Sequence, residues 1–175
     1  MNAEWIHCAD ESGETPMTRA SGSGRVELTN VLLMQEIEDN VANISRMSPL
    51  HRAAYLGYDD AVCDLIADGA DAAEKNSEGE TALHIAVRFG HENVAKILLD
   101  AGVDPNAANG LGMTPLHWAS LSGNETQTRL LLAAGADPNA QEWASGGLTP
   151  LEVAELMGYD ELVELFKSGL NQWAA

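Results

Sequence analysis

Apolar and polar positions recur along this chain with one long period. Short boxes start with a small hydroxyl residue and continue with apolar residues, at Thr15, Ser48, Thr81, Thr114 and Thr149. By subtraction, the steps between them are 33, 33, 33 and 35 residues. An alanine follows each hydroxyl after five residues and a glycine after nine. Three signals in one register indicate an internal repeat, and a period of this length is typical of solenoids.

Each box predicts the start of a helix. The side-chain oxygen of Thr or Ser accepts a hydrogen bond from an otherwise unpaired N–H, and proline is tolerated at the first helical position. Four boxes have that proline, at Pro16, Pro49, Pro115 and Pro150. In the last box, Thr149 and Glu152 have the spacing of a capping box. The glycine nine residues on can adopt the left-handed conformation that ends a short helix.

A second helix is expected after each glycine, for example over residues 92–100 and 125–133. Its apolar positions, Val94 and Leu98 among them, are expected to pack between neighbouring repeats. The run GADPNA at residues 135–140 predicts a loop that returns to the next box. Neither helix is long enough to be stable alone, so stability is expected to come from stacking at roughly 10 Å per repeat.

The TPLH boxes, followed by HENVAKILLDAGVDPNA and LLLAAGADPNA, resemble the ankyrin repeat family from about Gly13 to the C-terminus. The resemblance implies an all-α repeat solenoid of stacked helix-turn-helix repeats with finger loops. Five repeats are expected, at about residues 13–45, 46–78, 79–111, 112–146 and 147–175. Residues 1–12 are expected to form an N-terminal tail or a leading finger.

The terminal repeats have the features that capping repeats require. The first is degenerate, with Thr18 where the pattern has His and Glu36 and Ile37 where later repeats have Gly and Ala. In the last repeat a set of charged residues is expected to cover the outer helix, namely Asp160, Glu161, Glu164 and Lys167. The interleaved apolar residues are expected to face inward, namely Leu162, Val163, Leu165 and Phe166.

Charge narrows the choice of partner. Nine Lys and Arg stand against 27 Asp and Glu, which gives a net charge of -18. This excess repels phosphate backbones and anionic lipids, so neither nucleic acid nor membrane is expected, and a basic protein surface is favoured. Cys8 and Cys63 lie far apart without metal-ligand spacing, which fits a reducing compartment. The N-terminus resembles no secretory signal and no apolar run could span a bilayer, so a cytoplasmic location is expected.

No catalytic, cofactor or metal site is expected. His51, His84 and His117 share one register, and in the ankyrin pattern each holds its own helix start and the next loop. Stacking keeps them roughly 10 Å apart, too far for shared metal ligation. His91 lacks the second histidine of a zinc helix, and Cys63 falls at an outward position without a base to activate it. The protein is therefore not expected to be an enzyme.

Partner-binding residues are expected in the variable part of each repeat. By the resemblance, finger tips and the exposed ends of first helices form a concave face that binds partners. On this chain the rule selects Met47, Tyr55, Leu56, Glu80, Arg88, Phe89, Leu111, Met113, Leu121, Trp143, Leu148, Leu156 and Met157. A contiguous apolar surface of this kind indicates a binding site. Alternatively, several of these residues pack against their own finger, Leu56 and Met157 above all.

The fourth finger, residues 141–147, is lengthened by two residues and carries Trp143 near its tip. An exposed tryptophan on a loop is a typical anchor of a protein interface. Two functions are compatible with these features. The first is an adaptor or stoichiometric inhibitor, a monomer when free, that binds a basic and partly apolar protein surface. The second is an acidic, immunity-type decoy that inhibits a basic nuclease or toxin.

Overall fold

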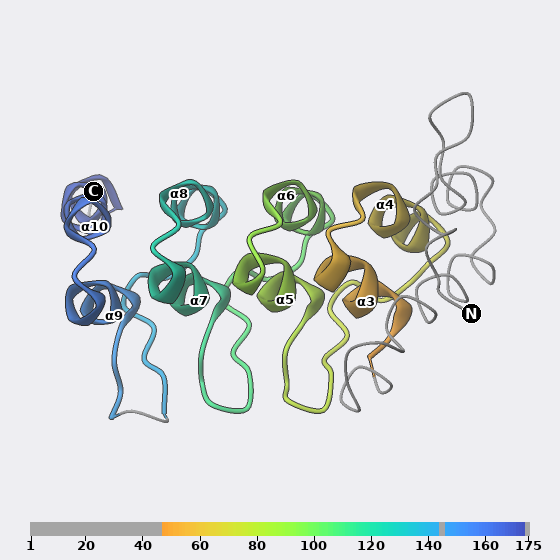
Figure 1. Ribbon diagram of the computed structural model, residues 1–175, viewed down its shortest axis with the longest axis horizontal. Helices are drawn as coiled ribbons and strands as arrows, with labels where there is room; N and C mark the ends of the chain where they lie inside the picture. The colour runs from red at the N-terminus through yellow and green to blue at the C-terminus, as the bar shows by residue number, and fades with distance from the viewer. Residues whose placement is uncertain (1–46, 144–145, 174–175) are drawn as a thin grey trace, which may run out of the picture.

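The computed structural model describes residues 47–143 and 146–173, with side chains described to residue 168. This part of the chain contains eight α-helices and no strand. Figure 1 shows them as two rows, one of first helices and one of second helices, with the long loops projecting from the row of first helices. The helices are α3 (Pro49–Leu56), α4 (Asp59–Ala67), α5 (Ala82–Arg88), α6 (Glu92–Asp100), α7 (Pro115–Ser122), α8 (Glu125–Ala133), α9 (Pro150–Met157) and α10 (Asp160–Trp173).

The helix pairs lie within the ranges predicted for the second to fifth repeats. The ranges predicted for α6 and α8, residues 92–100 and 125–133, are confirmed. The predicted first repeat, residues 13–45, and the segment 1–12 lie outside the described residues. Within the described part, no helix is long and apolar enough to cross a membrane.

The glycines that end the first helices have the predicted left-handed backbone. Gly57, Gly90, Gly123 and Gly158 have φ values of 73°, 81°, 65° and 75°. At Gly57 a second constraint applies, because a Cβ there would lie 2.4 Å from Nδ1 of His91 in the next repeat. A larger residue at that position would therefore suffer both backbone strain and a side-chain clash.

The recurrent alanines allow neighbouring first helices to approach closely. Ala53, Ala86, Ala119 and Ala154 are all fully buried. Each first helix contacts the first helix of the next repeat, and α4 and α6 likewise contact each other in the row of second helices. Val94 and Leu98, predicted to lie between repeats, are also fully buried. One hydrophobic core therefore runs through the described repeats.

The last helix has the two faces that the sequence predicts. Leu162, Val163 and Phe166 are buried, whereas the four charged residues expected on the outside, Asp160, Glu161, Glu164 and Lys167, are exposed. α10 has 14 residues, compared with nine in α4, α6 and α8. Its outer polar face closes the C-terminal end of the stack.

One buried polar side chain interrupts the core. Gln127 of α8 is fully buried, and neither its Oε1 nor its Nε2 has a hydrogen-bond partner among the described residues. Fully buried Val94 of α6 stands 33 positions earlier in the same register. An unpaired buried amide destabilises the fold because it has lost its hydrogen bonds to water.

Leu98→Ala is expected to lower the free energy of unfolding by about 2–5 kcal/mol, because it opens a cavity between repeats. Cys63→Ala is the control, since Cys63 is exposed on α4 and little is expected to change. Urea unfolding measures both variants. Equal midpoints would show that the second-helix register is wrong.

Gln127→Leu is expected to raise the free energy of unfolding by about 1–3 kcal/mol, because it removes two unpaired polar atoms from the core. Gln141→Leu makes the same chemical change at an exposed position and is expected to leave the free energy of unfolding nearly unchanged. Thermal and urea unfolding of the two variants test this. A loss of stability in Gln127→Leu would contradict it.

Candidate functional site

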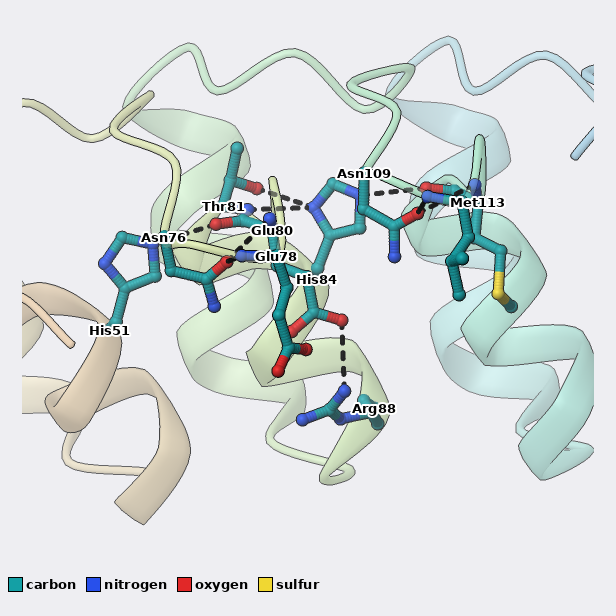
Figure 2. A network of polar contacts seen from close by, with 10 residues as sticks. His51, Asn76, Glu78, Glu80, Thr81, His84, Arg88, Asn109 and Met113 are labelled. Atoms are coloured by element: carbon teal, nitrogen blue, oxygen red, sulfur yellow. Dashed lines mark hydrogen bonds and ion pairs between the residues drawn. The ribbon is translucent and has the colours of Figure 1, made fainter. Parts of the chain in front are cut away.

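The histidines of the repeated boxes join each first helix to the finger that follows it. The backbone N–H and the hydroxyl of Thr81 both donate to Nδ1 of His84, over 3.1 and 2.9 Å. Nε2 of His84 lies 3.1 Å from the carbonyl oxygen of Met113 in the next finger. Figure 2 shows how this ring spans the space between the two elements. The prediction that such histidines hold their own helix start and the next loop is confirmed.

The same connection recurs along the stack. Nε2 of His51 lies 3.0 Å from the carbonyl oxygen of Glu80, and Nε2 of His117 lies 3.1 Å from that of Leu148. Thr149 starts the last box, where Glu152 replaces histidine. The backbone N–H of Thr149 donates to Oε2 of Glu152 over 2.8 Å, and the backbone N–H of Glu152 donates to the hydroxyl of Thr149 over 3.3 Å. These two bonds confirm the predicted capping box.

His91 has a different but also structural role. Its Nε2 lies 2.9 Å from the carbonyl oxygen of Tyr55 at the end of the preceding first helix. Its ring covers Gly57, so it joins two neighbouring repeats at their helix junctions. The structural interpretation of His91 is confirmed.

These bonds determine the protonation state of His84. Nδ1 accepts from the Thr81 N–H and carries no proton, and the Met113 carbonyl can only accept, so Nε2 must donate. The imidazole is therefore neutral. Burial lowers the pKa of His84 from 6.5 to about 4. Burial also lowers the pKa values of His51 and His117.

Asparagine side chains give the fingers their shape. Oδ1 of Asn76 accepts hydrogen bonds from the backbone N–H groups of Glu78 and Glu80, both over 2.9 Å. Asn109 accepts in the same way from Leu111 and Met113, over 2.9 and 3.0 Å. The sequence analysis missed these two residues, although they are 33 positions apart in the repeat register. That spacing is the signal that could have revealed them.

The fourth finger uses a longer side chain at the same position. Glu142 stands 33 residues after Asn109. Its N–H donates to the carbonyl of Leu148 over 3.1 Å, and its Oε1 accepts from the N–H of Leu148 over 3.2 Å. Glu142 therefore connects the two ends of this finger, which is two residues longer than the others.

Neighbouring finger tips are joined by backbone hydrogen bonds. The N–H of Gly110 donates to the carbonyl of Glu78, and the N–H of Trp143 donates to the carbonyl of Leu111, both over 2.8 Å. This approach requires glycine, because a Cβ on Gly79 would lie 2.8 Å from the nitrogen of Gly110. The fingers therefore support one another at their tips as well as at their bases.

Trp143 lies against the preceding finger and is still largely open to solvent. Its ring is so close to Gly112 that a Cβ there would be 2.8 Å from the indole. The side chain is nevertheless 71% exposed. Trp143 is thus held in place by its backbone bond and by this contact, while most of its surface is available.

A cluster of aromatic rings around Arg88 occupies the ends of the first helices. The rings of Tyr55 and Phe89 meet edge to face, with centroids 4.6 Å apart. The guanidinium of Arg88 lies 5.0 Å from the ring centroids of both Phe89 and Trp118. Trp118 was not predicted from the sequence; it occupies a box position where other repeats have Arg52, Ile85 and Val153.

Glu80 does not belong to the exposed face, contrary to the sequence prediction. It is 1% exposed, and its Oε1 pairs with Nη1 of Arg88 at 3.0 Å, as Figure 2 shows. Burial raises the pKa of Glu80 although the Arg88 charge opposes the shift. The physical reason is its set of contacts: its N–H donates to Oδ1 of Asn76 in the finger, and its carboxylate pairs with Arg88. In other repeats this position is apolar, at Met47, Met113 and Leu148.

The other predicted residues differ in exposure. Five of them are exposed, with fractions of 43% for Phe89, 52% for Leu111, 71% for Trp143, 72% for Leu156 and 48% for Met157. The remaining seven are half-buried: Met47, Tyr55, Leu56, Arg88, Met113, Leu121 and Leu148. Leu56 packs partly against the hydrophobic core, whereas Met157 is exposed. The alternative interpretation, that these two residues pack against their own finger, stays a prediction.

Titratable side chains in the described part do not assemble into a metal site, since no three His, Cys, Asp or Glu side chains gather there. Cys63 is exposed, and desolvation together with the charges of Asp60, Asp64 and Asp59 raises the pKa of its thiol. A raised pKa disfavours the reactive thiolate. The surroundings of Cys63 therefore do not activate its thiol as a nucleophile.

The fold and its surface define a stacked helical repeat protein whose finger loops and first helices present one face. The sequence profile described as ankyrin repeats (3 copies) matches residues 2–76 and 50–142. The chain therefore belongs to the ankyrin repeat family, whose members are generally protein–protein interaction modules. A comparison with curated proteins gave no match.

His84 is expected to stay neutral at about pH 5.5, with its proton on Nε2, since its pKa in the folded chain is about 4. The unfolded chain binds this proton between about pH 6.5 and about pH 4. The contribution of His84 to stability is therefore complete above that window and is lost as the pH falls through it.

Glu80 acts in the opposite direction, because its raised pKa lets the folded state bind a proton more readily at low pH. The test is therefore an NMR titration of the His84 ring nitrogens instead of a melting curve. A charged His84 ring in the folded protein at about pH 5.5 would contradict the assigned hydrogen bonds.

Proposed function

We propose that this protein is a stoichiometric protein-binding module, an adaptor or inhibitor, that holds its partner against the face formed by the fingers and first helices. One observation carries the proposal. Every large hydrophobic side chain that is exposed in the described part belongs to the set predicted for this face: Phe89, Leu111, Trp143, Leu156 and Met157. Exposed apolar side chains gathered on one face mark an interaction site.

The rigidity of this face supports the proposal. The fingers are tied at their bases by the box histidines and at their tips by the Gly110 and Trp143 N–H groups. A face that is already ordered loses little conformational entropy when it binds. The cluster of Tyr55, Arg88, Phe89 and Trp118 adds the aromatic and arginine side chains that are enriched at interface centres.

The proposed partner presents a basic and partly apolar surface, because the chain has a net charge of -18. The same proposal places the protein in the cytoplasm, as a monomer when free. Among the described residues Cys63 is exposed and has no disulfide partner, which fits such a reducing compartment.

An acidic decoy of a basic nuclease or toxin is the second candidate, and the net charge favours it. The salt dependence of binding distinguishes these two candidate functions. Charge-dominated binding collapses in moderate salt, whereas binding through the apolar residues persists, because salt screens exposed charges and not apolar contacts.

Trp143→Ala and Leu156→Ala are each expected to weaken binding by about 2 kcal/mol or more, because exposed anchors at the interface centre carry most of the binding energy. Lys96→Ala, on the exposed side of α6, is the control and is expected to leave the affinity nearly unchanged. The partner is first captured from native cells, and affinity and Tm are then measured together for each variant. Loss of binding in Lys96→Ala with both other variants unaffected would move the site to the second helices.

A further inference from the structure

A row of carboxylates follows the ends of the first helices. It consists of the acidic residues in the first turns of the four second helices, Asp59, Asp60, Glu92, Glu125, Asp160 and Glu161, and is here called the acidic rim. Within the described residues, one ion pair involves the rim, between Arg129 and Glu125. The rim therefore keeps most of its negative charge.

Two residues of the acidic rim lie close in the chain to exposed apolar side chains. Glu92 follows Phe89 by three residues, and Asp160 follows Met157 by three. Three residues span at most about 11 Å even when extended, and here a left-handed glycine turns the chain back within that distance. Rim carboxylates and apolar anchors are thus within reach of one partner segment.

The rim continues from α4 to α6. Nδ2 of Asn93 donates to Oδ2 of Asp59 over 2.9 Å, which places the first turns of α4 and α6 side by side. At the same junction, Nε2 of His91 bonds the carbonyl of Tyr55, and the ring of Tyr55 contacts that of Phe89. Carboxylates and aromatic rings therefore follow the same line across these two repeats.

An acidic residue at a helix N-terminus also has a purely structural use, because it interacts favourably with the helix dipole. That effect acts on every carboxylate in a first turn, including both of those in α4 and in α10, so position alone does not separate a dipole role from a docking role. The two roles differ in what they change, since a dipole contribution alters stability and a docking contribution alters affinity.

We propose that the partner is a protein segment with a fixed orientation: its apolar side chains lie on the exposed residues of the face, and its Lys or Arg side chains reach over the acidic rim. The inference rests on the proposed function and adds to it where the basic side chains of the partner bind and how the partner segment is oriented. Opposite charges beside an apolar contact accelerate association and fix its register.

The probe is a peptide selected from a random displayed library on the immobilised full chain. The selected peptides are expected to combine an aromatic or large aliphatic residue with Lys or Arg. Their Kd values are measured by calorimetry in about 50 mM and about 300 mM NaCl, since the Debye length falls as salt rises. Three variants are compared with the unchanged chain. The first is the double rim variant Glu92→Gln and Asp160→Asn, the second is the double control variant Asp100→Asn and Glu164→Gln, and the third is the single variant Phe89→Ala.

The two double variants remove equal charge, one pair from the rim and the other from exposed positions farther along α6 and α10. The rim pair is expected to raise Kd about tenfold at low salt, and the control pair less than about twofold. Phe89→Ala is expected to weaken binding at both salt concentrations. Melting curves of all variants separate a loss of affinity from a loss of fold.

Equal effects of the two double variants, or selection of acidic peptides, would overturn the inference while Phe89→Ala still supports the proposed function. A rim effect seen in Tm alone would also overturn it, because that is the result of a dipole role. Failure of Phe89→Ala to change Kd would instead count against the proposed face itself, as would failure to select any peptide.

Discussion

The structure depends on a constraint of helix length. The helices from α3 to α9 have seven to nine residues, too few to be stable in water without tertiary contacts. Each therefore depends on packing against its partner helix and against neighbouring repeats. Fully buried alanines such as Ala86 and Ala119 allow that close approach, and the regular period keeps them opposite one another. The repeat is therefore a requirement of stability as well as a feature of sequence.

The box histidines extend this order from the helices to the loops. A ring such as His84 is fixed at its own helix start and bonds the next finger through its second nitrogen. Because each bridge connects one repeat to the next, the position of a finger is set by the helix before it. The finger tips then add a second set of connections through the N–H groups of Gly110 and Trp143. The result is a face composed of loops that are tied both to the helical stack and to one another.

Most of the fold could be predicted from the sequence, because its signals are local and periodic. Capping residues, left-handed glycines and buried alanines all follow one register, so each repeat confirms the others. The candidate face was less predictable. The rule taken from the family resemblance placed Glu80 on the exposed face, yet Glu80 is buried and pairs with Arg88 eight residues later. Met47 and Met113 in the same register are half-buried, so the register alone does not predict the full burial of Glu80.

Other elements could not be predicted because they depend on contacts between distant residues. The stacking of Arg88 on Trp118 joins residues of two repeats, and no spacing in the sequence predicts this contact. The shaping role of Asn76 and Asn109 was visible as a 33-residue spacing, but its meaning needed the backbone of the finger. Glu142 shows the same function carried out by a different residue type, which a search for identical residues misses.

The fourth finger also shows how such a protein can diversify. It is two residues longer than its neighbours, yet Glu142 still closes its base and His117 still bonds Leu148 beyond it. Changes in length and composition are therefore absorbed between two anchored ends, where they do not disturb the helices. The positions that vary within a finger are therefore separate from those that hold the helices together. Evolution or an engineer can thus change the length and composition of a finger and leave the stacked helices as they are.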